Sequence, residues 1–283
     1  MKYTASEKIF EKKVRKTMEK YALADRRDKI IVACSGGKDS TVTAYLMKKL
    51  GYRTEALHVD LGIGEWSENN RKNLEKFCIK YAIPLHIVDS KKEFSSSMIQ
   101  LRSVAQLRTG LASCTICGVI RRWLINKKAR ELCADKLATG HNMDDGAQTV
   151  LMNITRGNLH LCLDLGPKSS ISKESRFVTK IKPLYFCREE EVRKYSKAKG
   201  FPVLYERCPC SFEASRQILR KWFPETEKKY RGITRNIVEY HLMIKPALNR
   251  IFRRQEITYC ESCGEPTRKK VCKACEFLRL AYR

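Results

Sequence analysis

The first two thirds of the chain alternate short apolar segments with longer amphipathic ones. The apolar segments have the length and β-branched content of buried strands, whereas the amphipathic ones repeat apolar residues with a helical period. We expect strands over 29–35, 53–60, 84–90, 136–142 and 178–184. We expect helices over 5–21, from the end of "GGKDS" to Leu50, from an N-cap at Ser67 to Tyr81, over 118–134 and over 189–199.

Strands and helices that alternate at this spacing predict an α/β fold. Its sheet should be doubly wound and mostly parallel, with helices on both faces. Residues 157–178 lack a clear period and are expected to form a loop. The pattern suggests four units, namely an N-terminal helix (1–24), an α/β domain (25–206), a basic helical region (207–256) and a cysteine-rich end (257–283).

The charge of the chain is strongly unbalanced. Lysine and arginine outnumber the acidic residues by 57 to 31, which gives a formal net charge of +26. Such a surplus attracts polyanions, and RNA, DNA and anionic lipid all suit it. A basic solvated surface in a salt-adapted or thermophilic cell is the alternative. Apolar runs stay well short of the roughly 20 residues that span a bilayer. The start lacks the apolar core of a secretory signal, so we expect a cytoplasmic protein.

The segment "SGGKDS" (35–40) follows an expected strand and opens an expected helix. In that position backbone N–H groups and the helix N-terminus hold phosphate, and Gly36 and Gly37 let the backbone approach the anion. Lys38 is a candidate counter-charge. An ordinary glycine turn is the alternative. The segment has neither the Walker A nor the GxGxxG spacing.

Two further segments follow strands and should lie at the same edge of the sheet, where ligands bind in such folds. They are "LHVDLGIGEW" (57–66) and "TGHNMDD" (139–145). Asp144 and Asp145 are placed to hold magnesium or to position a nucleotide. Alternatively they cap the following helix, Asp144 in particular. His141 is either part of the site or a packed, hydrogen-bonded histidine.

The thirteen cysteines indicate metal or catalytic sites rather than disulfides, because the expected compartment is reducing. Four are spaced Cys260-x2-Cys263-x8-Cys272-x2-Cys275, with Gly264 in the first turn. Two Cys-x2-Cys pairs at this spacing are typical of a structural zinc ribbon, whose four thiolates complete a tetrahedral shell. We predict zinc there, with another metal as the alternative.

Cys114 and Cys117 form a Cys-x2-Cys pair without a second pair of the same kind. The other cysteines in a suitable context are Cys208 and Cys210, in "YERCPCS". Three thiolates suit an iron–sulfur cluster with one iron open to a substrate, because such clusters normally have four cysteine ligands. A redox dithiol is the rival, because a Cys-x2-Cys pair ahead of a helix lowers a thiolate pKa. These residues alone leave the two interpretations open.

Taken in order, seven segments resemble those of the tRNA 2-thiolation enzymes of the TtcA/TtuA type. They are "SGGKDS", "LHVDLGIGEWS", "CTICG", "ATGHNMDDGAQTV", "KIKPLYFCREEEV", "ERCP" and the cysteine-rich end, and they cover nearly the whole chain. This family belongs to the ATP-pyrophosphatase superfamily, with an adenine nucleotide alpha hydrolase-like fold. The resemblance implies a tRNA-uridine 2-sulfurtransferase. In such an enzyme ATP adenylates the C2 oxygen of the base, pyrophosphate leaves, and sulfur replaces the oxygen as AMP departs.

The resemblance also implies cofactors and their residues. ATP, with Mg2+, would contact Ala33, Ser35, Gly36, Gly37, Lys38, Asp39, Ser40, Val59 and Gly140. Asp145 would be the catalytic aspartate. A 4Fe-4S cluster that presents sulfur at its free iron would be held by Cys114, Cys117 and Cys208. Cys210 ranks behind Cys208 as third ligand, and it is also a candidate sulfur carrier.

The partners that the resemblance implies are tRNA, a sulfur donor and a second copy of the chain in a homodimer, with no membrane. The donor is sulfide, a persulfide or a ubiquitin-like thiocarboxylate protein. Three features depart from the family pattern. Arg121 stands where relatives place a lysine, which gives planar, bidentate geometry beside the cysteine pair. Gly146 replaces an acid after the two aspartates. The chain also begins directly in a helix, where relatives often have a second zinc module.

Two other functions fit some of the same residues. One is another adenylating ligase of the superfamily, amidotransferase-like or lysidine-forming, which would not use the three cysteines. The other is a zinc-ribbon RNA-binding protein with a degenerate nucleotide fold, against which the intact "SGGKDS" argues. Among thiolation enzymes, the ribbon and "LGIGEWS" favour the thiouridine branch, with 2-thiocytidine synthesis as the alternative.

Overall fold

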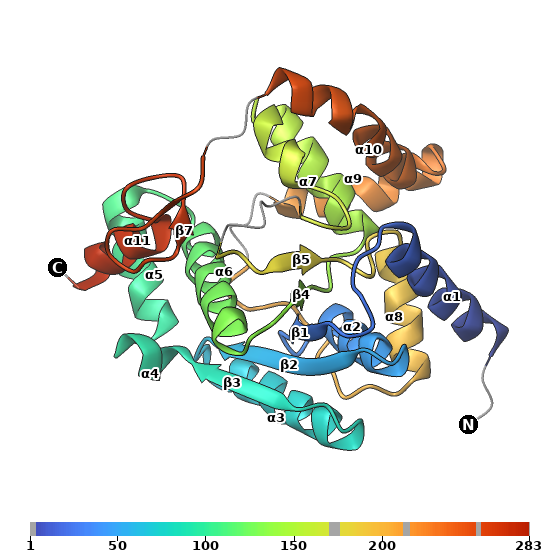
Figure 1. Ribbon diagram of the computed structural model, residues 1–283, viewed down its shortest axis with the longest axis horizontal. Coiled ribbons are helices and arrows are strands. Elements are labelled where there is room, and N and C mark those ends of the chain that lie inside the picture. Colours follow the sequence, from blue (N-terminus) through green and yellow to red (C-terminus); the bar gives the residue numbers. More distant parts are fainter. Residues whose placement is uncertain (1–3, 170–175, 212–215, 253–255, 283) are drawn as a thin grey trace.

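The computed structural model describes residues 4–169, 176–211, 216–252 and 256–282. A five-stranded sheet lies at its centre (Figure 1). In the order β3-β2-β1-β4-β5, its strands are β3 (Leu85–Asp89), β2 (Arg53–Asp60), β1 (Lys29–Ala33), β4 (Lys136–Ala138) and β5 (Thr179–Ile181). Every neighbouring pair is parallel, which confirms the predicted sheet. The strand order reverses between β1 and β4, where such folds bind ligands.

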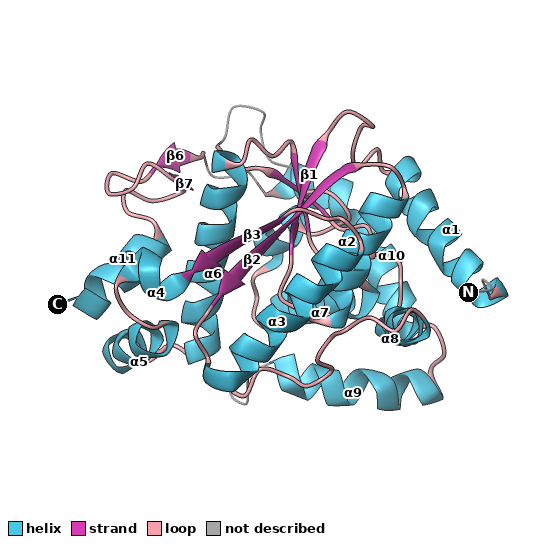
Figure 2. Ribbon diagram, turned by 90° about the horizontal axis from the view of Figure 1, so that it is seen from below, coloured by secondary structure: helices cyan, strands magenta, loops and turns pink. Residues whose placement is uncertain are grey.

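Helices cover both faces of the sheet because successive strand residues point to opposite sides. Ile30 and Val32 pack toward one set of helices, and Ile31 packs toward the other. The first set consists of α1 (Ala5–Lys20), α2 (Lys38–Lys49), α3 (Gly64–Lys80) and α8 (Glu189–Ala198). The second consists of α4 (Ser90–Phe94), α5 (Met98–Thr109) and α6 (Ser113–Glu131). Figure 2 shows α4, α5 and α6 on one side of the strands and α1, α2 and α8 on the other.

A third group of helices packs at the β5 end of the sheet (Figure 1). It consists of α7 (Met143–Thr155), the 3-10 helix η1 (Leu159–Asp164), α9 (Arg216–Lys229) and α10 (Ile233–Ile251). Its small core includes Met143, Tyr185, Phe223 and Val238. The carboxylate of Glu227 accepts hydrogen bonds from backbone N–H groups at the start of α10, so it links α9 to α10.

Four details differ from the sequence predictions. Ser67 is not an N-cap, because α3 begins at Gly64 and Ser67 Oγ accepts from Ile63 N inside the first turn. The stretch before the cysteine pair forms α5, which starts in a capping box between Ser97 and Gln100. Helix α6 begins at Ser113, so the cysteine pair lies inside the helix rather than ahead of it. The expected loop over 157–178 includes η1, and residues 170–175 lie outside the described residues.

The cysteine-rich end packs on α5 and α6. It consists of β6 (Thr258–Tyr259), β7 (Pro266–Thr267) and α11 (Lys273–Tyr282), with Phe277 of α11 buried beside α6. Glu265 is 2% exposed, pairs with Arg130 and accepts from Asn126 Nδ2 at 3.1 Å, so α6 anchors this end. The division into four units stays a prediction. Among the described helices, none has the length and apolarity to cross a membrane.

Candidate active site

A cavity of about 410 Å³ opens at the carboxyl ends of β1, β2 and β4. Its size lies within the range of small-molecule sites. Eight of the residues expected at the site line it, namely Ala33, Ser35, Asp39, Ser40, Val59, Arg121, Gly140 and Asp145. They come from two strand ends, the start of α2, the middle of α6, the turn after β4 and the start of α7. The fold therefore collects at one place residues that are widely spaced along the chain.

Two glycines permit the close approach of backbone segments around the "SGGKDS" loop. Gly36 has a φ of +82°, and a Cβ there would lie 2.7 Å from Asn70 Oδ1. A Cβ on Gly140 would lie 2.6 Å from the backbone carbonyl carbon of Asp39. Only glycine fits both positions without a shift of the backbone or of its neighbour. The loop thus presents the N-terminus of α2 at the cavity, an arrangement that holds anions.

Lys38 is not among the residues that line the cavity. Its Nζ lies 2.8 Å from Asp39 Oδ2 and 2.9 Å from Glu189 Oε1. Burial opposes the charge, but the two carboxylates prevail and raise the pKa of Lys38. In this arrangement Lys38 fixes Asp39 and ties α2 to α8. Its expected part in holding phosphate stays a prediction.

Asp144 also lies outside the cavity lining and holds the start of α8. Its Oδ2 accepts from the Glu189 backbone N–H at 2.7 Å, and its Oδ1 lies 3.2 Å from Arg188 Nη2. A carboxylate at a helix N-terminus offsets the positive end of the helix dipole. Asp144 is therefore a capping residue, of α8 rather than of the helix that contains it.

Two carboxylates, Asp39 and Asp145, line the cavity side by side. Asn142 joins them, because its Nδ2 donates to Asp39 Oδ1 at 3.1 Å and its Oδ1 accepts from Asp145 N at 3.1 Å. Burial raises the pKa of Asp39, and the charge of Asp145 adds to that rise. Oxygen ligands of this kind suit Mg2+, whose charge would relieve both the burial and the repulsion.

Six cationic side chains line the same cavity: Arg121, Arg122, Lys180, Lys182, Arg216 and Arg220. Burial lowers the pKa of Lys182 to about 8, with Lys245 and Lys180 adding to the shift. Arg216 Nη1 lies 3.4 Å from Asp145 Oδ1, so only part of this charge is balanced within the site. A polyphosphate fits such a cavity, because it supplies the missing negative charge.

Five of these six cations were missed by the sequence analysis, which expected only Arg121. Lys180 lies in β5 and Lys182 directly follows the strand, so the two lysines are spaced to project to the same side of the chain. This alternation of lysines can be recognised in the sequence as an indication of a basic side of the chain. Arg216 and Arg220 of α9 carry no comparable signal, because a basic helix far along the chain is ordinarily a solvated surface.

His141 lies in this cationic surrounding and donates to or accepts from Thr139 Oγ1 at 2.8 Å. Its side chain is exposed to the cavity, and desolvation by the cavity walls lowers its pKa to about 3, with the charges of Lys182, Arg216 and Arg121 adding to the shift. His141 is therefore neutral near pH 7, so it can offer a hydrogen bond but adds no charge. Its exposure rules out the packed histidine considered as the alternative, although the hydrogen bond is present, and its part in the site stays a prediction.

Four cysteines lie close together at the N-terminal end of α6, here called the base of α6. Cys114 and Cys117 occupy its first turns, and Cys208 and Cys210 approach from the loop after β5 and α8. The Cys114 thiol donates to the Cys210 carbonyl at 3.2 Å, and the Cys208 thiol contacts that of Cys210. Cys117, Cys208 and Cys210 pack against the same hydrophobic cluster. The structure thus joins two pairs that are about 90 residues apart along the chain.

This set of cysteines fits an anionic iron–sulfur cluster. Arg102 of α5 points into it, with Nη2 2.9 Å from Cys210 Sγ, while Arg102 Nε is buried without a hydrogen-bond partner in the described part of the chain. Burial raises the pKa of Cys117, against the influence of Arg121 and Arg102. A bound metal removes that obstacle, because it holds the deprotonated thiolate. An unpaired buried donor beside several thiols suits a negatively charged cluster, which would accept its hydrogen bond.

The ribbon cysteines have a different geometry. The four sulfur atoms of Cys260, Cys263, Cys272 and Cys275 lie within 4.8 Å of one another. Cys263 Sγ and Cys272 Sγ are 3.8 Å apart, and a tetrahedron with zinc–sulfur bonds of about 2.3 Å has edges of about that length. Burial opposes the Cys260 thiolate, but backbone N–H groups lower its pKa to about 6. The set fits a structural zinc ion.

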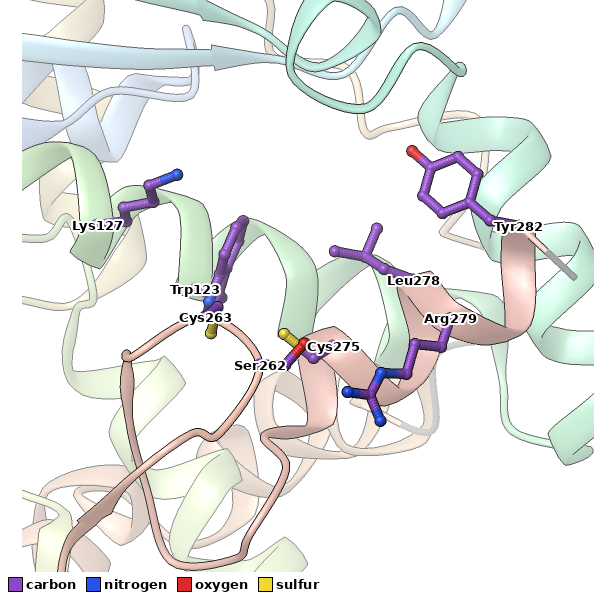
Figure 3. A pocket seen from close by; sticks show the side chains of 8 residues that line it. All are labelled: Trp123, Lys127, Ser262, Cys263, Cys275, Leu278, Arg279 and Tyr282. Carbon is purple, nitrogen blue, oxygen red and sulfur yellow. The ribbon is translucent and has the colours of Figure 1, made fainter.

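A second cavity, of about 450 Å³, lies between α6 and this ribbon. Figure 3 shows Trp123 of α6 beside Cys263, with Leu278 and Tyr282 of α11 along the opening. Four thiolates around one zinc ion leave no ligand position for a substrate. We therefore place the chemistry at the first cavity, where carboxylates, cations and the other thiols meet.

Comparison with protein families matches residues 6–225 to the PP-loop domain family. The chain is 37% identical over 268 residues to the tRNA-5-methyluridine(54) 2-sulfurtransferase of Pyrococcus horikoshii, covering 95% of this chain and 84% of that protein. It is 30% identical over 275 residues to cytoplasmic tRNA 2-thiolation protein 1 of Caenorhabditis elegans, covering 94% of this chain and 71% of the relative.

Among solved structures, the U34-tRNA thiolase NcsA from Methanococcus maripaludis, with its [4Fe-4S] cluster, is similar. The TM-score is 0.80 at 30% identity, and the match covers 98% of this chain and 90% of that one. A likeness to the NMN synthetase of Francisella tularensis, at 12% identity and a TM-score of 0.50, shows the fold alone.

Proposed function

Because the chain belongs to the PP-loop domain family and, within it, to the tRNA 2-thiolation proteins, we propose that it thiolates a tRNA uridine with ATP. One juxtaposition carries the proposal. Cys114, Cys117 and Arg121 are spaced to lie on one face of α6, and Arg121 lines the cavity that holds the "SGGKDS" loop. A nucleotide site and a thiol site therefore share one wall, as a reaction that couples adenylation to sulfur transfer requires.

The cavity would carry out the adenylation. The backbone at Gly36 and Gly37, with the N-terminus of α2, would hold the departing pyrophosphate. Asp39 and Asp145 would hold Mg2+, and Asp145 would act as the catalytic aspartate. Preorganised cations stabilise the charge that develops when the bond between the α and β phosphates breaks. The remaining nucleotide contacts would come from Ala33, Ser35, Ser40, Val59 and Gly140.

The thiol site would hold a 4Fe-4S cluster through Cys114, Cys117 and Cys208. When bound, such a cluster supplies an iron at which sulfur is held as a nucleophile. The residues of this chain then have two tasks. Arg102 would offset the negative charge of the thiolates, and Arg121, whose charge acts on Cys117 and which lines the cavity, would lie between the thiolates and the nucleotide.

Further partners follow from the same proposal. The ribbon would hold Zn2+ as a structural ion that keeps α11 on α5 and α6. The cations of α9, with the net charge of +26, would meet the tRNA backbone. We propose sulfide or a ubiquitin-like thiocarboxylate protein as sulfur donor, a homodimeric assembly, and a cytoplasmic location like that in the name of the Caenorhabditis elegans relative.

The test is nucleoside mass spectrometry of tRNA from a strain that lacks the gene. We expect one 2-thiouridine derivative to disappear, and the wild-type gene to restore it. Asp145→Ala and Cys208→Ala should not restore it. Cys133→Ala is the matched control and should restore it fully, because Cys133 is an exposed thiol beyond the end of α6.

The other functions give different results in the same experiment. Persistence of every 2-thiopyrimidine would contradict thiolation. Loss of 2-thiocytidine alone would indicate the cytidine branch. If every 2-thiopyrimidine persists but another modified nucleoside is lost, and Cys208→Ala restores that nucleoside while Asp145→Ala does not, the chain is another adenylating ligase of the superfamily.

A further inference from the structure

Cys210 is the one cysteine at the thiol site to which the proposed function assigns no role. It is half-buried and follows Cys208 by two residues. Its carbonyl accepts from the Cys114 thiol at 3.2 Å, and its thiol contacts that of Cys208. The charge of a Cys210 thiolate also reaches Cys117. Cys210 therefore borders the same space as the three expected cluster ligands.

The surroundings of Cys210 differ from those of the packing cysteines. Cys34, Cys78 and Cys187 are at most 3% exposed and belong to the apolar cluster between the sheet and its helices. Cys210 instead accepts a hydrogen bond from Arg102 Nη2 at 2.9 Å. A guanidinium held against a sulfur atom is a partner for an anionic thiolate. The contact with Arg102 therefore suits a Cys210 that binds a metal and is released from it. It does not suit a cysteine that only fills space in the core.

Arg102 supports this interpretation, because it is built into the site. It lies on α5, between the buried residues Leu101 and Ala105 and the loop that carries Cys210. Its Nε is buried and has no hydrogen-bond partner among the residues that the structure describes. A guanidinium with one donor on Cys210 and another unsatisfied can hold an anion in either of two neighbouring positions.

We propose that Cys210 is an exchangeable fourth ligand of the cluster, which closes the fourth iron until sulfide takes its place. This inference rests on the proposed cluster. On closure the Cys210 thiol loses its proton to solvent and an iron–sulfur bond forms. When hydrosulfide binds, that bond breaks, a bond from iron to the new sulfur forms, and the Cys210 thiolate passes to Arg102. No electrons are transferred in either step. A cluster with four cysteine ligands is complete, so the resting site is closed to oxidants.

The first experiment measures how readily the cluster loses its fourth iron. Wild type, Cys210→Ser and the matched control Cys133→Ser are reconstituted anaerobically, and iron and acid-labile sulfide are assayed. Each sample is then treated with ferricyanide, and the three-iron cluster is quantified by electron paramagnetic resonance. We expect several-fold more three-iron signal from Cys210→Ser than from the other two. Equal yields from all three proteins would overturn the proposal.

A second measurement needs no variant. Cluster-loaded wild-type protein is alkylated with and without sulfide, and the labelled cysteines are mapped by mass spectrometry. We expect Cys210 to be protected without sulfide and labelled with it, while Cys208 stays protected in both. Labelling of Cys210 in both conditions would overturn the role, and so would release of Cys208 instead. A protein without iron would refute the proposed cluster itself, a failure that the metal assay identifies separately.

Arg102 is a positioning residue in this scheme, and it has its own readout. Arg102→Gln keeps a hydrogen-bond donor but removes the charge that receives the thiolate. We expect several-fold more sulfide to be needed for half-maximal labelling of Cys210, at unchanged iron content. An unchanged sulfide requirement would show that Arg102 only packs against the loop.

Discussion

The protein contains two groups of four cysteines, and they are built in opposite ways. The ribbon group comes from 16 consecutive residues, and its sulfur atoms lie within 4.8 Å of one another. The group at the base of α6 comes from two distant segments, stays half-buried and faces Arg102 and Arg121. A compact shell of four thiolates fits one structural ion, whereas a looser group beside cations fits a cluster that exchanges a ligand. The surroundings of the cysteines, rather than their number, therefore distinguish a structural metal site from a reactive centre.

The largest effect is expected from the group at α6. Cys117→Ala should lower the rate of tRNA thiolation by about 1,000-fold, because it removes a group on which the whole sulfur-transfer step depends. Zinc content and thermal stability should stay near those of wild type. Rate assays under anaerobic conditions, with metal analysis of the same samples, check this. If Cys117→Ala kept a tenth of the wild-type activity, the cysteine group at α6 would not be the reactive centre that distinguishes it from the ribbon.

The ribbon should respond in the reverse manner. Cys272→Ser should lower the zinc content and reduce the free energy of unfolding by about 4 kcal/mol, because loss of a structural metal is among the most damaging single changes. The iron content of the protein that stays folded should be unchanged. Denaturant unfolding and metal analysis test this. Loss of iron together with zinc would mean that the two groups are not independent.

One glycine at the nucleotide site and one in the ribbon extend the comparison between the reactive centre and the ribbon. Gly140→Ala places a Cβ 2.6 Å from the Asp39 backbone and should lower kcat/KM for ATP by about 100-fold, since small displacements at a reacting site are costly. Gly264→Ala in the ribbon, at a φ of +69°, should cost only about 1 kcal/mol of stability and leave kcat/KM unchanged. Steady-state kinetics with ATP as the varied substrate compares them. If both variants had the same kcat/KM for ATP, the "SGGKDS" loop would tolerate the displacement that the Cβ at position 140 causes.

The smallest expected effect is a pH dependence of the nucleotide site. Burial holds the pKa of Lys182 at about 8, below the ordinary value, so its charge is present at pH 7 and is lost as the pH rises through 8. The dissociation constant for ATP should therefore rise by roughly fivefold between pH 7 and pH 9, as expected for one buried charge-assisted contact. Lys182→Met should bind ATP more weakly and lack this pH step. Calorimetric titration tests it, and a step retained in the variant would assign the pH dependence to another group.

Several features could be predicted because neighbouring residues determine them. The glycine pair between a strand and a helix predicts the loop, and two Cys-x2-Cys pairs within 16 residues predict the ribbon. Alternating apolar and amphipathic segments predict the parallel sheet. Helix α5 was missed although its signals are present, with Ser97 and Gln100 as a capping box and Met98, Leu101 and Ala105 on its buried face. The serines and basic residues around those positions hid the helical period.

Other features could not be predicted, because they depend on groups that meet only in the folded chain. The position of Lys38 in "SGGKDS" does not reveal that Asp39 and Glu189 neutralise its charge, since Glu189 is about 150 residues away along the chain. The contact of Arg102 with Cys210 likewise joins helix α5 to a loop more than 100 residues later. Their partners depend on how helices pack on the sheet.

The amino-acid sequence by itself therefore determines the local structures of this protein. These are the "SGGKDS" loop, the cysteine-rich ribbon and the alternating strands and helices that form the sheet. Backbone conformation and periodic burial act over a few residues, so local patterns suffice for them. The tertiary structure alone decides which charges face the cavity, which carboxylate is free for a cation and which thiols share one space. Those properties depend on desolvation and on distances between remote segments, and neither exists before the chain has folded.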